Sequence, residues 1–284
     1  MAIPASELII NQNGTIYHLN LQPEHISDTI ITVGDPDRVP MVSKYFDEIE
    51  VQITKREFVT HTGYYKGKRI TVISTGMGTD NIDILMNELD ALVNIDFQSR
   101  EPNEEKIALK IVRIGTSGSL QSDIPLGSHL ASHYAVGLDS LLEFYPLEEE
   151  EDEHSISKAL QEQLGVGFRP YVVNGSRSLI EKIAFDMIPG NTLTCPGFYA
   201  PQGRVLRGGL RNPDLLQVYQ DFRVCDFRLT NFEMETAGYY AMGRLLGHEM
   251  LSLNAIVANR ISQEFATNAE EVINNLIVKV LDRI

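Results

Sequence analysis

The chain has 284 residues, 43% hydrophobic and 22% charged, a composition typical of a globular protein with a sizeable core. Its 24 basic and 39 acidic side chains give a formal net charge of −15, which argues against nucleic acid and anionic membrane surfaces as partners. The two cysteines, Cys195 and Cys225, are too few for a disulfide framework or a four-cysteine zinc site.

Short apolar, β-branched runs alternate along the chain with longer stretches of helical period. The predicted strands are Thr29–Val33, Arg69–Thr75, Ile107–Ile114, Ser128–Val136, Arg169–Asn174 and Leu251–Ala258. The predicted helices are Pro36–Phe46, Asn81–Phe97, Ser155–Leu164, Ser176–Met187, Pro213–Phe222, Glu233–Leu246 and Asn268–Arg283. This alternation, with few hairpin signals, predicts an α/β fold whose helices cover both faces of a sheet. No repeat or long linker interrupts it, so we expect one domain over residues 1–284.

Three features bear on location. The first basic residue is Arg38, so the N-terminus lacks the positive region of a secretory signal. No apolar run approaches the ~18 residues of a membrane span. Together with two cysteines that fit a reducing compartment, this predicts a cytoplasmic protein. Six consecutive acids are usually a solvated loop or an exposed first turn of a helix. The acidic run Glu148–Glu153 is interpreted as a solvated loop rather than a metal site, because consecutive acids cannot all face one ion.

The segment Val33-Gly-Asp-Pro-Asp-Arg38 directly follows a predicted strand. Its glycine allows a sharp turn, Asp35 can cap a helix and Pro36 suits the first helical position. The N–H groups of a helix N-terminus, together with Arg38, would hold an oxyanion. A plain strand-to-helix turn with a surface arginine explains the segment equally well.

A second segment, Arg113-Ile-Gly-Thr-Ser-Gly118, stands at the end of another predicted strand. An arginine in an otherwise apolar strand is costly to bury without a partner. Thr116 and Ser117 supply hydroxyl groups, and the glycines let a ligand approach the backbone. A pairing of Arg113 with a core carboxylate would also explain the pattern. Two such segments favour a ligand site, because ligands bind at the carboxyl edge of open α/β sheets.

The segment Thr192–Arg204 combines an aromatic ring with planar polar groups. Phe198 offers a stacking face, the Gln202 amide both donates and accepts, and Arg204 adds fixed donors. This trio could bind the edge of a planar imide while the ring covers its face. By composition alone, the prolines and glycines of the segment favour an ordinary surface loop.

Two carboxylates, Glu233 and Glu235, open a predicted helix and point in different directions. One could cap or pair while the other enters a cleft, where a carboxylate can bind vicinal hydroxyl groups bidentately. Acids favoured by the helix dipole are the ordinary alternative. Weaker signals, each with a simple structural explanation, are His18, Arg56-Glu-Phe58 and Ser74-Thr-Gly-Met-Gly78.

In this order the segments resemble the nucleoside phosphorylases of the trimeric/hexameric class, and within it the uridine phosphorylases. The resemblance runs from about His18 to the C-terminal helix. Its most specific parts are Gly34-Asp-Pro-Asp-Arg38, Arg113-Ile-Gly-Thr-Ser-Gly118, Phe198-Tyr-Ala-Pro-Gln-Gly-Arg204 and Glu233-Met-Glu235. It implies a three-layer α/β/α domain with a central mixed sheet and an active site completed by a neighbouring subunit.

The resemblance also assigns residues to three parts of a site. The phosphate-binding residues would be Gly34, Arg38, Arg113 and Thr116, with Arg56 arriving from a partner chain. The ribose-binding residues would be Met234 and Glu235, with His18 of a partner chain on the 5′-hydroxyl. The base-binding residues would be Phe198, Gln202, Arg204, Ser117 and Gly118.

One stretch departs from the family pattern. After Ser74-Thr-Gly-Met-Gly78 the family usually continues with proline or alanine and then serine, whereas this chain has Thr79, Asp80 and Asn81. Some bacterial relatives hold a monovalent cation near that serine and near a glutamate that matches Glu57. The sequence therefore does not decide whether a monovalent cation binds near Glu57 at a subunit interface, and no metal-ligating residues are assigned.

The implied reaction converts uridine and phosphate to uracil and ribose 1-phosphate, in pyrimidine nucleoside salvage. Phosphate attacks C1′ as the glycosidic bond breaks, so positive charge develops on the sugar and negative charge on the uracil. Arg113, Arg204 and Glu235 are the expected catalytic residues, because they hold the phosphate, meet the charge on the base and orient the sugar. No organic cofactor is required.

Three alternatives stay open. A purine nucleoside phosphorylase would have an aspartate after a late strand, but Ile256–Arg260 contains no acid. A hydrolytic nucleosidase of the same fold would have no use for Arg38 and Arg113. A non-catalytic nucleoside-binding or assembly protein would not need every charged position to be retained. The sequence decides neither dimer against hexamer, nor ribose against deoxyribose, nor uridine against thymidine or a modified uridine.

Overall fold

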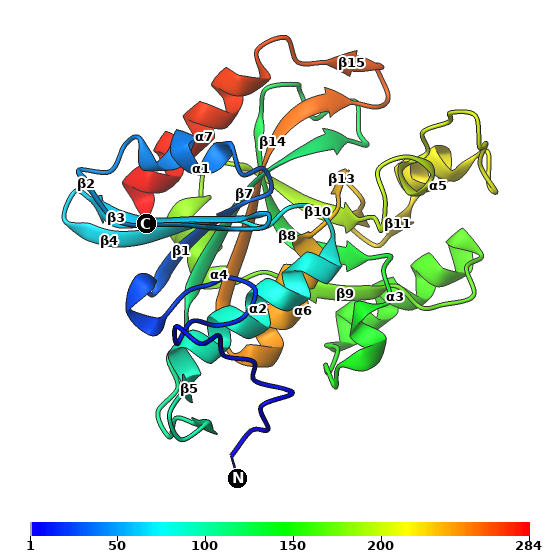
Figure 1. The fold of residues 1–284 in the computed structure, drawn as a ribbon. Coiled ribbons are helices and arrows are strands. Elements are labelled where there is room, and N and C mark those ends of the chain that lie inside the picture. Colours follow the sequence, from blue (N-terminus) through cyan, green and yellow to red (C-terminus); the bar gives the residue numbers. More distant parts are fainter. Residues whose placement is uncertain (1) are drawn as a thin grey trace. The chain divides into compact units, whose positions relative to one another are not determined.

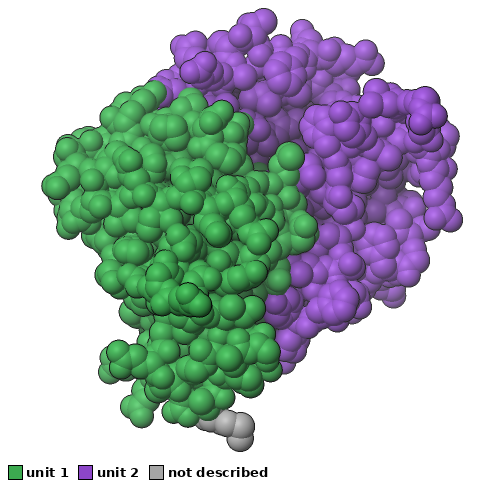
Figure 2. Space-filling model, in the orientation of Figure 1, with its two compact units in different colours: residues 1–113, 242–249 green, residues 114–241, 250–284 purple. Residues whose placement is uncertain are grey.

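The computed structural model describes residues 2–284, which form two compact units (Figures 1 and 2). Unit 1 comprises the residues up to 113 together with 242–249, and unit 2 comprises 114–241 and 250–284. The chain passes between them within β7 (Lys110–Ser119), within α6 (Thr236–Leu246) and within β14 (Glu249–Asn259). A single domain over residues 1–284 remains a prediction.

Unit 1 is built on a mixed sheet with the strand order β2–β3–β4–β1. Its other elements are the 3-10 helix Pro23–His25, α1 (Arg38–Ser43), α2 (Thr79–Asn94), and the short pair β5 (Ile95–Asp96) and β6 (Glu101–Pro102). The sheet strands are β1 (Thr29–Val33), β2 (Glu48–Lys55), β3 (Phe58–Tyr65) and β4 (Lys68–Ser74). β1 and β4 run parallel, and their apolar residues are almost wholly buried, as expected for strands covered on both faces.

Two hairpins in unit 1 differ from the expectation of few hairpins. β2 pairs with β3, and β3 pairs with β4, both antiparallel. The tight turn between β3 and β4 contains Lys66 and Gly67, which both have positive φ angles, as type I′ hairpin turns require. β2 alternates exposed and half-buried residues and has one partner strand, so its apolar signal is too weak to stand out in the sequence.

Unit 2 contains a sheet that closes on itself. Its strands are β8 (His129–Gly137), β9 (Tyr171–Asn174), β10 (Ile188–Thr194), β13 (Asn231–Glu233), β15 (Glu264–Phe265) and the second part of β7. β14 pairs with β8 and with β7, and β10 and β13 link β8 to β7, so five strands form a ring. Ring closure leaves these five strands without a free edge.

Helices and short strands complete unit 2. They are the 3-10 helices Leu141–Phe144 and Ala200–Gln202, α3 (Glu151–Leu164), α4 (Arg177–Ile183), α5 (Leu215–Asp221), β11 (Arg223–Val224), β12 (Phe227–Arg228) and α7 (Ala269–Arg283). On α7, which was predicted as a helix, the apolar residues Val272, Leu276 and Val280 are buried. The predicted α/β class, a mixed sheet with covering helices, is confirmed. No helix among the described residues is both long and apolar enough for a membrane span.

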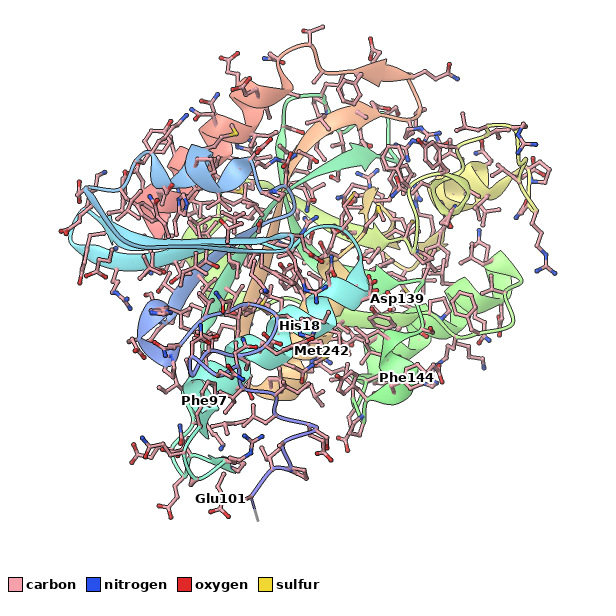
Figure 3. The ribbon with its side chains drawn as sticks, in the orientation of Figure 1. His18, Phe97, Glu101, Asp139, Phe144 and Met242 are labelled. Atoms are coloured by element: carbon pink, nitrogen blue, oxygen red, sulfur yellow. The ribbon has the colours of Figure 1, made fainter. Side chains whose placement is uncertain are left out.

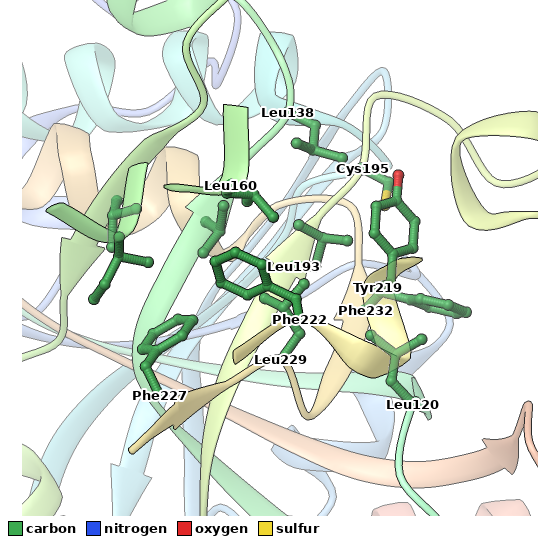
Figure 4. Packing of buried hydrophobic residues seen from close by; sticks show 13 residues of the cluster. Leu120, Leu138, Leu160, Leu193, Cys195, Tyr219, Phe222, Phe227, Leu229 and Phe232 are labelled. Atoms are coloured by element: carbon green, nitrogen blue, oxygen red, sulfur yellow. The ribbon is translucent and has the colours of Figure 1, made fainter. Parts of the chain in front are cut away.

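One hydrophobic cluster of unit 2 supports the loop on which the base site was predicted (Figure 4). It contains Leu193, Cys195, Tyr219 and Phe232, all nearly inaccessible to solvent. The Cys195 thiol and the Tyr219 hydroxyl both donate to the carbonyl oxygen of Pro201, at 3.5 and 3.0 Å. Two hydrogen bonds to Pro201 therefore connect this loop to the hydrophobic core of unit 2.

Two local predictions were wrong. The acidic run is not a solvated loop throughout, because α3 begins at Glu151 and Glu153 is completely buried. The Glu153 carboxylate accepts the N–H groups of Glu150 and Asn174 at 2.9 Å, which explains how an acid can be buried there. The segment Arg113–Gly118 is not a loop after a strand, because it lies within β7.

Candidate active site

In unit 1, two glycine-containing loops leave the same end of the sheet. β1 and β4 are parallel with Val33 beside Ser74, and the N–H of Thr75 donates to the Val33 carbonyl at 3.0 Å. A Cβ atom on Gly34 would lie 3.6 Å from the carbonyl oxygen of Gly76. The loop that leads to Arg38 therefore lies against the loop after β4, at the carboxyl ends of both strands.

The turn before Arg38 forms differently from the prediction. The Asp35 carboxylate accepts the N–H of Asp37 at 3.0 Å, so it stabilises the turn, while α1 itself begins at Arg38. Arg38 is half-buried and the loop around it is fixed by the hydrogen bond from its N–H to the Asp35 carbonyl. The predicted helix start at Pro36 is thus shifted by two residues.

Arg113 lies on a strand that begins beside β1. The N–H of Lys110, the first residue of β7, donates to the Asp28 carbonyl just before β1. Arg113 follows three residues farther along β7, which is the neighbour of β1 in the sheet. Its side chain is buried, with 5% of the residue exposed, as expected of an arginine inside an apolar strand.

The Arg56–Glu57 turn joins β2 to β3 at the same end of the unit 1 sheet. The Ser74 hydroxyl, at the end of β4, donates to the Glu57 carbonyl at 2.6 Å and accepts the N–H of Val59 at 2.8 Å. Arg56 is exposed and has a φ of 54°, so its side chain projects from a tight turn. Among the described residues, no group of three acidic, histidine or cysteine side chains is arranged to hold a metal ion.

In unit 2, the predicted base-binding residues contact one another. Arg204 Nη1 donates to Gln202 Oε1 at 2.5 Å and to the Phe198 carbonyl at 2.7 Å. The Arg204 guanidinium lies 3.7 Å from the centre of the Phe198 ring, so it covers one face of that ring. Gln202 is buried, whereas 49% of Phe198 is exposed. Phe198 is therefore the more accessible of the two side chains.

Arg260 also belongs to this cluster, although the sequence analysis did not select it. Its Nη1 atom donates to the Gln202 carbonyl at 3.0 Å. Both Arg204 and Arg260 place a guanidinium 5.7 Å from the Phe232 ring centre. Burial and the neighbouring Arg260 lower the pKa of Arg204 to about 10, and burial lowers the pKa of Arg260. Two cations held this way favour a partner with negative charge.

Gly118 and Ser117 pack beside the same cluster. A Cβ atom on Gly118 would lie 3.0 Å from the Phe232 ring and 3.7 Å from Arg260 Cγ, so a larger residue here would have to displace the Phe232 ring. The Ser117 hydroxyl accepts a hydrogen bond from the Asn231 amide at 2.9 Å. The Asn231 side chain is itself fully buried. The end of β7 is therefore held rigidly.

The two carboxylates at the start of α6 have different roles. Glu233 accepts the N–H groups of Glu235 and Thr236 at 3.0 Å and the Thr194 hydroxyl at 2.7 Å. It therefore caps the helix and links it to β10, as one of the two acids was expected to do. Glu235 and Met234 follow directly, with Glu235 6% exposed and Met234 half-buried.

Comparison with known proteins places the chain in a family. The model of the Phosphorylase superfamily matches residues 28–282. The chain belongs to this superfamily. The uridine phosphorylase of Thermococcus kodakarensis is 29% identical over 92% of this chain and 83% of its own. A DeoD-type purine nucleoside phosphorylase of Streptococcus suis is 27% identical, covering 89% of this chain and 91% of its own.

A solved member of the superfamily has the same fold. The nucleoside phosphorylase of Trypanosoma brucei, described as showing uridine phosphorylase activity, superposes with a TM-score of 0.87 and 27% identity. The match covers 98% of this chain and 100% of that one. The predicted nucleoside-phosphorylase-like fold is thereby confirmed.

Each unit thus gathers part of the predicted site. Unit 1 holds Gly34, Arg38, Arg56, Arg113 and His18, and unit 2 holds Thr116, Ser117, Gly118, Phe198, Gln202, Arg204, Met234 and Glu235. Contacts within a unit join Phe198, Gln202 and Arg204 to one another. The roles of these residues toward phosphate, ribose and base remain predictions. The sequence gives no local signal for Arg260, because it reaches the Gln202 carbonyl from 58 residues away.

Proposed function

We propose that the protein catalyses the phosphorolysis of uridine to uracil and ribose 1-phosphate, as a pentosyltransferase of pyrimidine nucleoside salvage. Membership of the superfamily supports a phosphorylase. The uridine phosphorylases of Thermococcus kodakarensis and Haemophilus influenzae, 29% and 28% identical, support uridine as the nucleoside. The two free cysteines fit a reducing compartment, and we keep the cytoplasm as the proposed location.

The order of hydrogen-bond donors and acceptors on Gln202 and Arg204 is the main reason to propose uridine as the substrate. Because Arg204 donates to Gln202 Oε1, the amide oxygen faces Arg204 and Nε2 lies on its other side. The edge offered to a ligand is then a donor (Gln202 Nε2), an acceptor (Gln202 Oε1) and a donor (Arg204). Oε1 can serve as the acceptor because it can accept a second hydrogen bond. The imide edge of uracil presents O4, N3–H and O2, which is acceptor, donor, acceptor. Cytosine presents donor, acceptor, acceptor and mismatches this order at two positions.

The charge of the cluster suits the leaving group. Phosphate oxygen forms the new bond to C1′ while the C1′–N1 bond breaks, and its electron pair moves onto the uracil ring. Arg204 and Arg260, whose pKa values are lowered without an anionic partner, gain one as this charge develops. Their attraction to the base is therefore stronger in the transition state than in the ground state, which is the condition for catalysis.

The remaining parts of the site follow from the same proposal. Arg38 and Arg113, with Gly34 and Thr116, bind the phosphate, which also stabilises the positive charge on the sugar. Glu235 and Met234, held by the α6 cap at Glu233, bind the ribose. The proposal needs no organic cofactor and no resident metal ion.

We infer a homo-oligomer in which neighbouring copies complete each site. Arg56 is exposed on the β2–β3 turn, and the His18 side chain is 30% exposed. Both are accessible enough to act on a substrate bound by another copy. Arg56 would add to the phosphate site and His18 would contact the 5′-hydroxyl.

A purine nucleoside phosphorylase is the second candidate, because DeoD-type enzymes are among the relatives. The position expected to carry an acid in that branch falls near Asn259, whose side chain is already engaged. Its oxygen accepts the N–H groups of Ile261 and Ser262, and its amide donates to the Gln121 and Ile124 carbonyls. With no carboxylic acid there to protonate a purine, uridine is the favoured substrate.

A panel of uridine, cytidine, inosine and adenosine with inorganic phosphate tests the proposal. We expect uridine to be cleaved well above the other three, and inosine faster than uridine would reverse the assignment. Gln202→Glu replaces the Nε2 donor with an acceptor and adds a negative charge opposite the departing base. We expect a loss of ~100-fold in kcat/KM for uridine, the usual effect of removing one such donor. Gln163→Glu, on an exposed position of α3, is the matched control.

A further inference from the structure

A glutamate on α2, Glu88, makes three contacts with His18 and a fourth with the next residue, Leu19. Glu88 Oε1 lies 2.6 Å from His18 Nδ1, and both carboxylate oxygens lie 3.0 Å from the His18 backbone nitrogen. Glu88 Oε2 also accepts the N–H of Leu19 at 2.9 Å. His18 lies against α2 in Figure 3. Glu88 is 70 residues from His18 in the chain, so no helix or hairpin geometry produces this arrangement.

The contact determines which ring nitrogen carries the proton. An ionised carboxylate can only accept hydrogen bonds, so Nδ1 must donate to Glu88. In the neutral imidazole Nε2 then has the free lone pair, on the side of the ring away from Glu88. The Tyr17 ring meets the imidazole edge-on, with centroids 4.6 Å apart, and further limits its rotation. The outer nitrogen of His18 is therefore an acceptor held in a fixed direction.

The segment that carries His18 is itself well anchored. Leu19 and Leu21, on either side of Asn20, are completely buried. The N–H of Ile16 donates to the Leu21 carbonyl at 2.8 Å, and the Thr15 hydroxyl lies 2.9 Å from Asn20 Oδ1. His18 is thus a partly exposed side chain on an ordered loop, the arrangement expected of a residue that meets a ligand.

We propose that Glu88 is a positioning residue, which presents His18 Nε2 as the acceptor for the 5′-hydroxyl of the nucleoside. Glu88 acts through the imidazole and does not itself touch the substrate. This rests on the proposed function, in which His18 contacts that hydroxyl. It adds a selective requirement: Glu88 matters for substrates with a 5′-hydroxyl and not for those without one.

The kinetic test compares uridine with 5′-deoxyuridine, which lacks only that hydroxyl. Glu88→Gln keeps the size of the side chain but has a single acceptor oxygen. In the wild-type protein, the donors on His18 and Leu19 use both oxygens of the carboxylate. We expect kcat/KM to fall ~10-fold for uridine and less than ~2-fold for 5′-deoxyuridine. His18→Ala should also lose kcat/KM for uridine selectively over 5′-deoxyuridine. The double variant should lose no more kcat/KM for uridine than His18→Ala alone. Glu162→Gln, at an exposed site on α3, should change neither substrate.

Equal losses on both substrates, or no loss on either, would overturn the role of Glu88. A second measurement does not depend on the stability of any Glu88 variant. Nitrogen-15 NMR of histidine-labelled wild-type protein, with His18→Ala to assign the signal, should show Nδ1 protonated and Nε2 unprotonated in the neutral ring. The opposite tautomer would also overturn it. If the wild-type protein does not cleave uridine at all, the proposed function fails, and the NMR result still decides whether Glu88 orients His18.

Discussion

Glu88 in unit 1 and Glu233 in unit 2 use the same chemistry to hold different kinds of structure. Each carboxylate accepts two or more backbone N–H groups and one side-chain donor. The backbone partners of Glu233 are two and three residues away, at the start of its own helix. Those of Glu88 are 70 and 69 residues away, in a loop.

The difference shows where a buried acid can be interpreted from sequence alone. An acid at a helix start has a local reason to be there, because the first N–H groups of a helix lack partners. Glu88 stands inside α2 (Thr79–Asn94), where nothing local requires it, and its purpose is visible only once the N-terminal loop has folded onto the helix. Glu233 is also more enclosed, because it is buried whereas Glu88 is half-buried.

The largest effect is expected at Glu233. Glu233→Gln leaves one acceptor oxygen for the Thr194 hydroxyl and two N–H groups, inside a site with little access to water. We expect the free energy of unfolding to fall by about 2–3 kcal/mol, the usual cost of leaving buried polar groups unsatisfied. Urea denaturation measures this, and activity should fall equally on uridine and 5′-deoxyuridine. A loss below about 0.5 kcal/mol would mean that the cap is not structural.

The smallest effect is expected at Glu181, which pairs with Arg177 on the surface of α4. The two side chains are 63% and 90% exposed and 2.7 Å apart. Exposed pairs of this spacing contribute little, because water solvates both charges well. Glu181→Gln should not measurably change the thermal unfolding midpoint. A shift of the midpoint as large as that caused by Glu233→Gln would show that the effect of losing a carboxylate does not depend on its burial. The loss of stability in Glu88→Gln is expected to lie between those of the other two variants.

Much of the fold could be predicted because its signals are local. The buried face of α7 and the continuous apolar strand β1 follow from periodicity. β10 and β13 were missed because Pro189, Gly190 and the polar residues at 191 and 231 interrupt the apolar pattern, although the second half of β10 and all of β13 are buried. The Asn191 and Asn231 side chains bond to partners that are distant in sequence.

In the candidate site too, contacts between residues close in the chain could be predicted, and contacts that depend on the fold could not. Phe198, Gln202 and Arg204 are close in the chain, so their contact could be expected from the sequence. That Arg204 covers one face of Phe198 could not, because the order of stacking depends on the fold of the loop. Arg260 reaches the Gln202 carbonyl from 58 residues away, and only the closed sheet of unit 2 brings its strand there.

The central claim is that inorganic phosphate is the nucleophile, bound by arginines that include Arg113. Its most direct measurement is phosphorus-31 NMR of the wild-type protein with uridine and phosphate, with uracil followed by absorbance. The account predicts ribose 1-phosphate in equal amount to uracil, no uracil without phosphate, and neither product from Arg113→Ala. Uracil released at the same rate without phosphate, with free ribose accumulating, would contradict it.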